Sequence, residues 1–138
     1  MRTVRSLHPL KICLLSLAVY GLSLAVEGEA RAQSVLHFPR VITADGVFTG
    51  LAISNPTPSS VTVTFTALNP DGSLVTESGV ENPVSISIPA GGQYTRIYPE
   101  IFGTDTPFNG WVEAVSATSG LTGFFLNGNS ALSDLDGA

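Results

Sequence analysis

Four aromatic side chains are the residues whose type and spacing best suit binding chemistry. Tyr94, Tyr98, Phe108 and Trp111 lie within 18 residues of one another. If these rings are exposed together, they form a surface that can stack on a sugar ring or anchor a protein partner. A Trp is also a common core residue of β-sandwich proteins, and we favour that role for Trp111. The four aromatics therefore suggest a small carbohydrate-binding module as an alternative function.

The chain after position 32 contains no complete catalytic motif. His37 is its single His, and neither a Cys nor a second His accompanies it, as an ordinary zinc site would require. The G-x-S-x-G elbow and the glycine-rich phosphate loops are missing, and a Ser–Lys pair is impossible without a Lys. We therefore expect no enzyme, no cofactor and no metal site. A hydrolase that uses His37 and nearby acids is the third hypothesis.

The carboxylates are scattered, and most of them fall in predicted turns. Glycosidase chemistry needs two facing carboxylates on a rigid frame, and among the acids we place Glu113 on a strand. Asp134 and Asp136, preceded by Asn127 and Asn129, faintly resemble a calcium-binding loop. The bidentate acid that such a loop needs further on is missing from this chain, so a polar linker is the better interpretation.

The first 32 residues have the three features of a secretory signal peptide. A basic start is followed by the apolar run Ile12–Val26, and Ala30 and Ala32 form a small-residue cleavage pattern. The run of 15 residues is short for a transmembrane helix, so a retained signal anchor is the lesser alternative. We expect cleavage after Ala32, no stable membrane span afterwards, and a secreted, periplasmic or cell-surface location in a bacterium.

Cleavage would leave a strongly acidic chain of 106 residues, about the length of one domain. Arg40 and Arg96 remain beside nine carboxylates, which gives a net charge of −7. Such a surface repels phosphate groups, so we expect no nucleic-acid partner and little attraction to anionic membranes. The single Cys13 lies in the predicted signal. The remaining chain must therefore be held by its hydrophobic core without a disulfide.

Val61–Leu68 is the clearest structural element of the sequence. Its β-branched and aromatic residues alternate with threonines at a period of two, which predicts a strand with one buried face. Asn69-Pro70-Asp71-Gly72 then matches a type I turn. We interpret this strand as a central strand of an antiparallel sandwich. Its threonine face offers neither charge nor aromatic rings to a ligand.

Similar patterns predict seven or eight short strands separated by turns every eight to twelve residues. Besides 61–68, they cover residues 34–42 with an edge or kink at Pro39, 48–54, 73–78, 84–88, 93–98, 111–117 and 121–126. Residues 99–103 suit a single helical turn. The prediction is an all-β, immunoglobulin-like sandwich at 33–127 after a signal helix at 1–32. Residues 128–138 are predicted to be a tail, or a linker to a missing following module.

The alternation also predicts which side chains form the core. Phe124 and Phe125 are adjacent, so one of them should face the core and the other a second layer or a partner. The expected inward residues are Val35, Leu51, Ile53, Val61, Val63, Phe65, Val84, Ile86, Ile88, Trp111 or Val112, and Phe124 or Phe125.

Three stretches resemble a family of β-sandwich modules in exported bacterial surface proteins. They are LAISNPTPSSVTVTFTALNPDG from Leu51 onward, then SIPAGGQYTRIYPEIFG, then GWVEAVS. The resemblance covers about residues 35–127 and implies an immunoglobulin-like or fibronectin-like extracellular module, of a kind often found in tandem and generally of unassigned function. It transfers no catalytic residue to this chain.

The leading functional prediction is a secreted, non-catalytic module for cell-surface interaction, such as adhesion, or for structural spacing. Its partner would be a protein or a polysaccharide at the cell surface, and its oligomeric state is left open. The first strand, interrupted by Pro39, would also leave a sheet edge to which another chain could add a strand.

Overall fold

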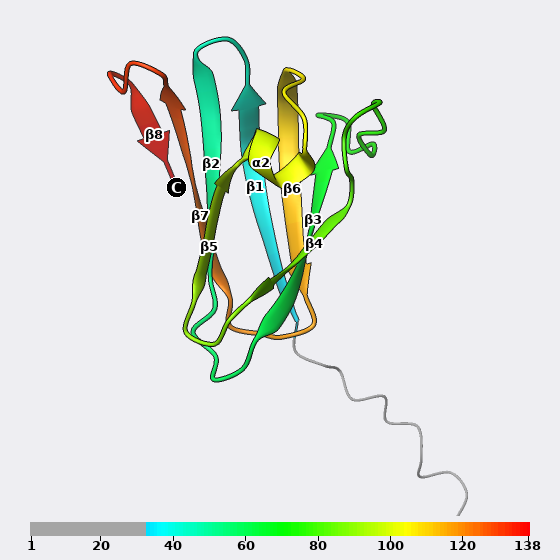
Figure 1. Ribbon diagram of the computed structural model, residues 1–138, viewed down its shortest axis with the longest axis vertical. Helices are drawn as coiled ribbons and strands as arrows, with labels where there is room; N and C mark the ends of the chain where they lie inside the picture. Colours follow the sequence, from blue (N-terminus) through cyan, green and yellow to red (C-terminus); the bar gives the residue numbers. More distant parts are fainter. Residues whose placement is uncertain (1–32) are drawn as a thin grey trace, which may run out of the picture. The chain divides into compact units, whose positions relative to one another are not determined.

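Alternating apolar and polar residues build two four-stranded antiparallel sheets that pack face to face (Figure 1). The computed structural model describes residues 33–138, and the signal-peptide prediction lies outside them. The elements are β1 (Ser34–Thr43), β2 (Val47–Ser54), β3 (Val61–Leu68), β4 (Val84–Ile88), β5 (Gln93–Ile97), α2 (Tyr98–Phe102), β6 (Phe108–Ser116), β7 (Thr122–Asn129) and β8 (Leu135–Gly137). No helix within the described residues is long and apolar enough to cross a membrane.

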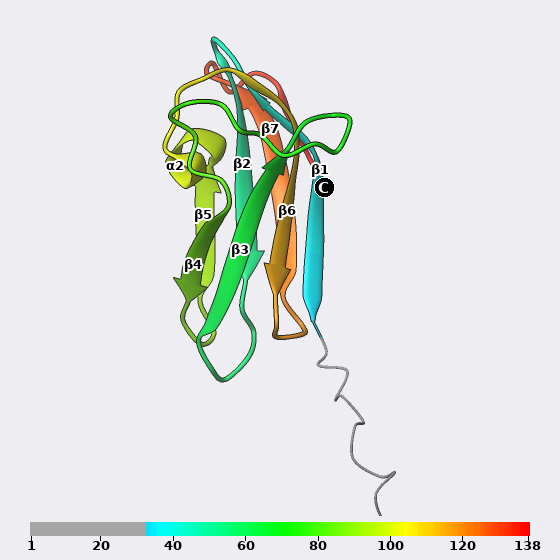
Figure 2. The same cartoon turned by 90° about the vertical axis from the view of Figure 1, so that its right-hand side faces the viewer.

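The strand order confirms the prediction of an all-β sandwich. The first sheet has the order β1-β6-β3-β4 and the second the order β5-β2-β7-β8. Figure 2 shows the first sheet in front, with β4, β3, β6 and β1 side by side. In an immunoglobulin constant domain the first strand pairs with the second. Here β1 pairs with β6 and β2 lies in the other sheet, so the narrower immunoglobulin-like prediction is not confirmed.

The strand β3 has the central place and the alternation that its sequence predicts. It lies between β4 and β6, and its alternate residues Val61, Val63, Phe65 and Ala67, with Phe65 at 0% exposure, point into the core. Leu51 and Ile53 of β2 face it from the second sheet, and Tyr94 of β5 packs against Phe65 with 5.7 Å between ring centroids. The core cluster consists of buried residues between 38 and 121, with partly buried neighbours between 36 and 125.

The single turn of helix predicted at 99–103 is present as α2, and it closes one end of the core. Pro99 occupies its first turn, and Gly103 ends it at φ 68°, a left-handed conformation that glycine adopts without strain. Tyr98 stacks on Phe108 with 4.3 Å between ring centroids and an interplanar angle of 5°. Phe102 packs on the same tyrosine at 4.8 Å.

The buried position of Tyr98 predicts a loss of stability at alkaline pH. Burial raises the pKa of Tyr98 to about 12, and the negative charge of Glu77 adds to the shift. Between pH 10 and 12 the unfolded chain therefore loses a proton that the folded chain keeps. The free energy of unfolding should fall across this range, by roughly 2–3 kcal/mol for two pKa units.

Urea unfolding of residues 33–138 at several pH values measures this loss. The substitution Tyr98→Phe keeps the ring and should remove most of the slope above pH 10. Tyr94, whose pKa is also raised by burial, should leave a smaller residual slope. An equal slope in the wild type and in Tyr98→Phe would contradict the assignment to Tyr98.

The strand β1 is an edge strand with a bulge at Pro39, as the proline predicts. Its pairing with β6 shifts register between Phe38 and Val41, and both of these residues are buried. The prediction that Val35 faces the core is wrong, because this side chain is 42% exposed. Phe38 faces the core, and side chains alternate along a strand, so Ser34 and Leu36 also point inward. Val35 therefore lies on the outer face.

Two sequence-based predictions about strand boundaries are also wrong. Residues 73–78 form no strand. A single backbone bridge joins Leu74 to Leu68, and the next residue, Val75, is buried. Conversely, part of the predicted tail at 128–138 belongs to the second sheet. The strand β8 pairs with β7, and Ala138 exchanges two backbone hydrogen bonds with Phe125 at 2.9 and 3.2 Å. A polar turn, rather than an apolar pattern, brings this segment back to the sheet.

Candidate functional site

The four predicted aromatic residues do not share an exposed surface. Tyr98 and Phe108 are buried against each other, and Tyr94 packs on the core from the inner side of β5. Trp111 lies on the outer face of the first sheet, half-buried, with its ring edge-on to His37 at 5.7 Å. The prediction that Trp111 is a core residue is wrong, because Val112 takes the inward position at 0% exposure.

His37 lies in a solvent-exposed pair on the outer face of the first sheet. It is opposite Glu113 on β6, and its Nε2 lies 3.1 Å from the Glu113 carboxylate. The His37 side chain is 57% exposed, so the pair resembles an ordinary cross-strand contact. Within residues 33–138 no group of three His, Cys, Asp or Glu residues is placed to hold a metal ion.

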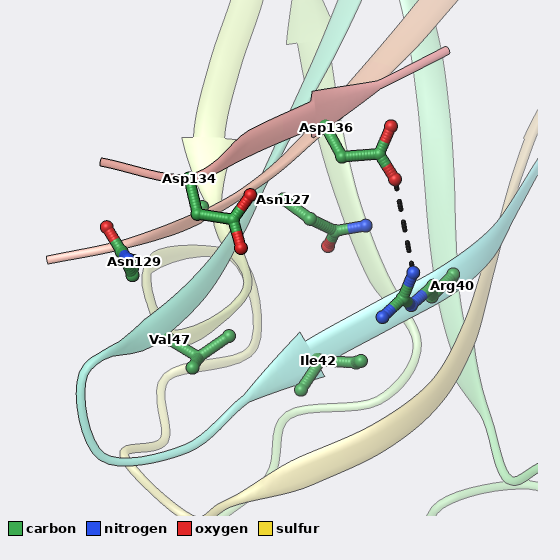
Figure 3. A pocket seen from close by; sticks show the side chains of 8 residues that line it. Arg40, Ile42, Val47, Asn127, Asn129, Asp134 and Asp136 are labelled. Atoms are coloured by element: carbon green, nitrogen blue, oxygen red, sulfur yellow. Dashed lines mark ion pairs between the residues drawn. The ribbon is translucent and has the colours of Figure 1, made fainter. Parts of the chain in front are cut away.

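A polar pocket of about 340 Å³ lies where β1 meets the hairpin of β7 and β8 (Figure 3). Asn127, Asn129, Asp134 and Asp136, the residues with the faint likeness to a calcium loop, all line it. Arg40, from the bulge in β1, faces them, with 4.0 Å between its guanidinium and the Asp136 carboxylate. The sequence pattern of Asn and Asp residues at alternate positions pointed to this cluster, but only the fold brings Arg40 to it.

The pocket has hydrogen-bonding groups of both charges, but its ion pair is weak. The Arg40 and Asp136 side chains are 64% and 75% exposed, and pairs of that kind contribute about 0–1 kcal/mol. Deeper inside, the Thr49 hydroxyl accepts a hydrogen bond from the Ile42 N–H at 2.8 Å and lies 2.5 Å from the Asn127 side-chain oxygen. The Asn127 side-chain nitrogen is buried and has no hydrogen-bond partner within residues 33–138.

A second candidate site is the outer face of the second sheet, where apolar side chains gather. Leu51 and Ile53 point into the core, so the alternate residues of β2 and their neighbours on β5, β7 and β8 point away from it. Phe124 and Leu135 are 49% and 53% exposed. We call this surface the outer apolar face; its apolar residues are Phe48, Gly50, Ala52, Ile97, Phe124, Leu126 and Leu135, and the polar residues Ser54, Gln93, Thr95 and Thr122 lie on the same side of the sheet.

A hollow of about 290 Å³ lies in the outer apolar face. Gly50 and Ala52 contribute little side-chain volume to it, whereas Phe48 and Leu126 supply larger apolar groups. Phe124 also lines the hollow while half of its surface remains exposed. This gives a projecting ring beside an apolar depression, which is the shape of an anchor and its pocket.

The outer apolar face is nearly free of charge, although the domain is strongly acidic. Strands β2, β5 and β7 contain no Asp or Glu, and Arg96 is their single charged residue. Arg96 lies at the hollow beside Glu100 of α2, with 3.9 Å between their charged groups. Depletion of charge around aromatic residues distinguishes the centre of protein interfaces from ordinary surface.

The sequence indicated one residue of this face but not the face itself. The adjacent Phe124 and Phe125 predicted one inward and one outward ring, and the structure confirms it. Phe125 packs against the core and Phe124 points outward. The pairing of the strands places Phe48, Ile97 and Leu135 on the same face as Phe124. No local sequence pattern predicts this pairing.

The fold defines the chain as an all-β sandwich of two four-stranded antiparallel sheets. Comparisons with known families, curated proteins and solved structures found no match. The function must therefore be argued from the outer apolar face and the polar pocket themselves.

Proposed function

We propose that residues 33–138 are an exported, non-catalytic β-sandwich module that binds a protein at the cell surface through its outer apolar face. The observation that supports this proposal best is the half-exposed Phe124 beside the apolar hollow. Large exposed apolar patches are uncommon on monomeric proteins and usually mark interaction sites. An aromatic anchor in such a patch typically supplies a large share of the binding energy.

A protein suits this face better than a polysaccharide does. Sugars need hydrogen-bonding groups beside the aromatic ring, because their hydroxyl groups lose water on binding. On the side of the hollow, the side chains around Phe124 are Ala52 and Leu126, and the charged groups there, Arg96 and Glu100, already face each other. The polar side chains of Ser54, Gln93 and Thr122 lie on the other side of the ring. A protein surface with an apolar centre and a polar margin would match this arrangement without leaving polar groups unpaired.

Binding to cells tests the proposed face directly. Labelled residues 33–138 should bind saturably to intact cells of the producing bacterium, and Phe124→Ser should weaken binding at least about 30-fold, as loss of an interface anchor does. The matched control is Val35→Ser, which removes a similarly exposed apolar side chain from the first sheet. Equal binding by the wild type and both variants would contradict the role of this face.

The proposed export rests on the signal-peptide features and on the resemblance to exported surface modules. The same resemblance is the basis for proposing immunoglobulin-like kinship. When the whole chain is expressed in a bacterium, we expect a product that begins at Gln33 outside the cytoplasm. Ala32→Phe should block cleavage, whereas Ala32→Ser should permit it, because the cleavage site requires a small residue. Mass spectrometry of cell fractions measures both outcomes, and an uncleaved wild-type chain would contradict the proposal.

A further inference from the structure

We infer that the protein which covers the outer apolar face is a second copy of this chain, in a two-fold symmetric dimer. This inference rests on the proposed function, since it names the partner of the same face. Three properties of the face support it: its shape, its distribution of charge and its extent over four strands.

The shape of the face is complementary to itself. In a two-fold contact the same patch is used by both subunits, so a projection and a depression that lie side by side can each meet their counterpart. Phe124 projects beside the hollow of about 290 Å³ that Phe48, Gly50 and Leu126 help to form. A dimer would place the Phe124 ring of each copy against the hollow of the other. Both exposed rings would then leave water at once.

The charge distribution favours this face over the rest of the surface for contact between two copies. Residues 33–138 have a net charge of −7, so most orientations bring carboxylates of two copies together. The face formed by β2, β5 and β7 contains no carboxylate of its own. Arg96 and Glu100, both about half-exposed at its edge, already pair within one copy, so neither adds an unpaired charge to the contact.

The four strands of the second sheet allow a broad contact. Sheets pack face to face at about 10 Å, the spacing already present inside this sandwich class. Four neighbouring strands, with Leu135 on β8 extending the apolar surface beyond Phe124, offer one continuous layer for this packing. The dimer would thus repeat on the outside of the second sheet the packing that its inner face makes with the first.

Sedimentation of purified residues 33–138 tests the inference without any other protein present. From about 5 μM to 500 μM the wild type should shift from monomer to dimer, as expected for a micromolar dissociation constant. Phe124→Ser should raise that constant at least about 30-fold, and Val35→Ser should leave it unchanged. Circular dichroism of each variant verifies that the fold is retained.

The outcomes distinguish this inference from the proposed function. A chain that stays monomeric throughout, while Phe124→Ser still abolishes cell binding, overturns the dimer and leaves the proposed function intact. A dimer that dissociates on Phe124→Ser, in a variant that binds cells normally, supports the dimer and overturns the proposed function. A dimer that is insensitive to Phe124→Ser but lost on Val35→Ser places the contact at the β1 edge and overturns the inference.

Discussion

Replacing Phe65 by alanine should lower the free energy of unfolding by about 3–5 kcal/mol, the usual cost of truncating a buried Phe. Phe65 is fully buried at the centre of β3, and its ring packs on Tyr94 across the two sheets. The substitution removes apolar area from the core and leaves a cavity that two strand-paired sheets cannot collapse to fill. A domain of this size has about 5–15 kcal/mol of stability in total, so the variant should be close to unfolding.

Urea unfolding of residues 33–138 at neutral pH measures this effect. Phe124→Ala is the matched control, because it makes the same chemical change on the outer face, where half of the side chain is already exposed. We expect this control to cost less than about 1 kcal/mol in dilute solution. Equal losses in the two variants would show that Phe65 is not the centre of the core.

Replacing Asn55 by alanine should lower the free energy of unfolding by about 3 kcal/mol, because it disrupts a buried hydrogen-bond network. Asn55 follows β2 and is fully buried. Its side-chain nitrogen lies 2.8 Å from the Ser59 carbonyl, 3.1 Å from that of Ile88 and 2.9 Å from that of Pro89. Its side-chain oxygen accepts hydrogen bonds from the Thr57 N–H and hydroxyl. One residue thus joins the loop after β2 to the end of β4.

The control for Asn55 is Asn69→Ala in the turn after β3. Asn69 donates one side-chain hydrogen bond, to the exposed Ser73 hydroxyl at 3.0 Å, and its loss should cost well under about 1 kcal/mol. Thermal and urea unfolding of the two variants should separate them clearly. An Asn55→Ala variant as stable as Asn69→Ala would mean that water replaces the lost contacts.

The local parts of the fold could be predicted because their signals are local. Alternation fixed the buried residues of β3, the proline marked the bulged edge of β1, and Pro99 with Gly103 marked the ends of α2. Where the signal was weak, the prediction failed. Residues 73–78 alternate too little to form a strand, and β8 consists of three exposed residues without any apolar pattern.

The candidate site could not be predicted in the same way, because period two divides a strand into two faces without saying what covers each face. Trp111 was expected inside and Val35 with it, yet long-range pairing turned both outward. The residues around Phe124 come from four strands between positions 48 and 135, and the aromatic cluster suggested at 94–111 is split between the core and the first sheet.

The sequence alone determined that this chain is an all-β protein, where most of its strands and turns fall, and that its expected mature form is acidic and free of disulfides. These properties follow from residue type and short-range spacing. Only the tertiary structure decided that apolar side chains also gather on the outer side of the second sheet, that Asn55 joins distant loops, and that Arg40 meets Asp136. These properties depend on antiparallel pairing between segments tens of residues apart, and that pairing is settled by packing of the whole core.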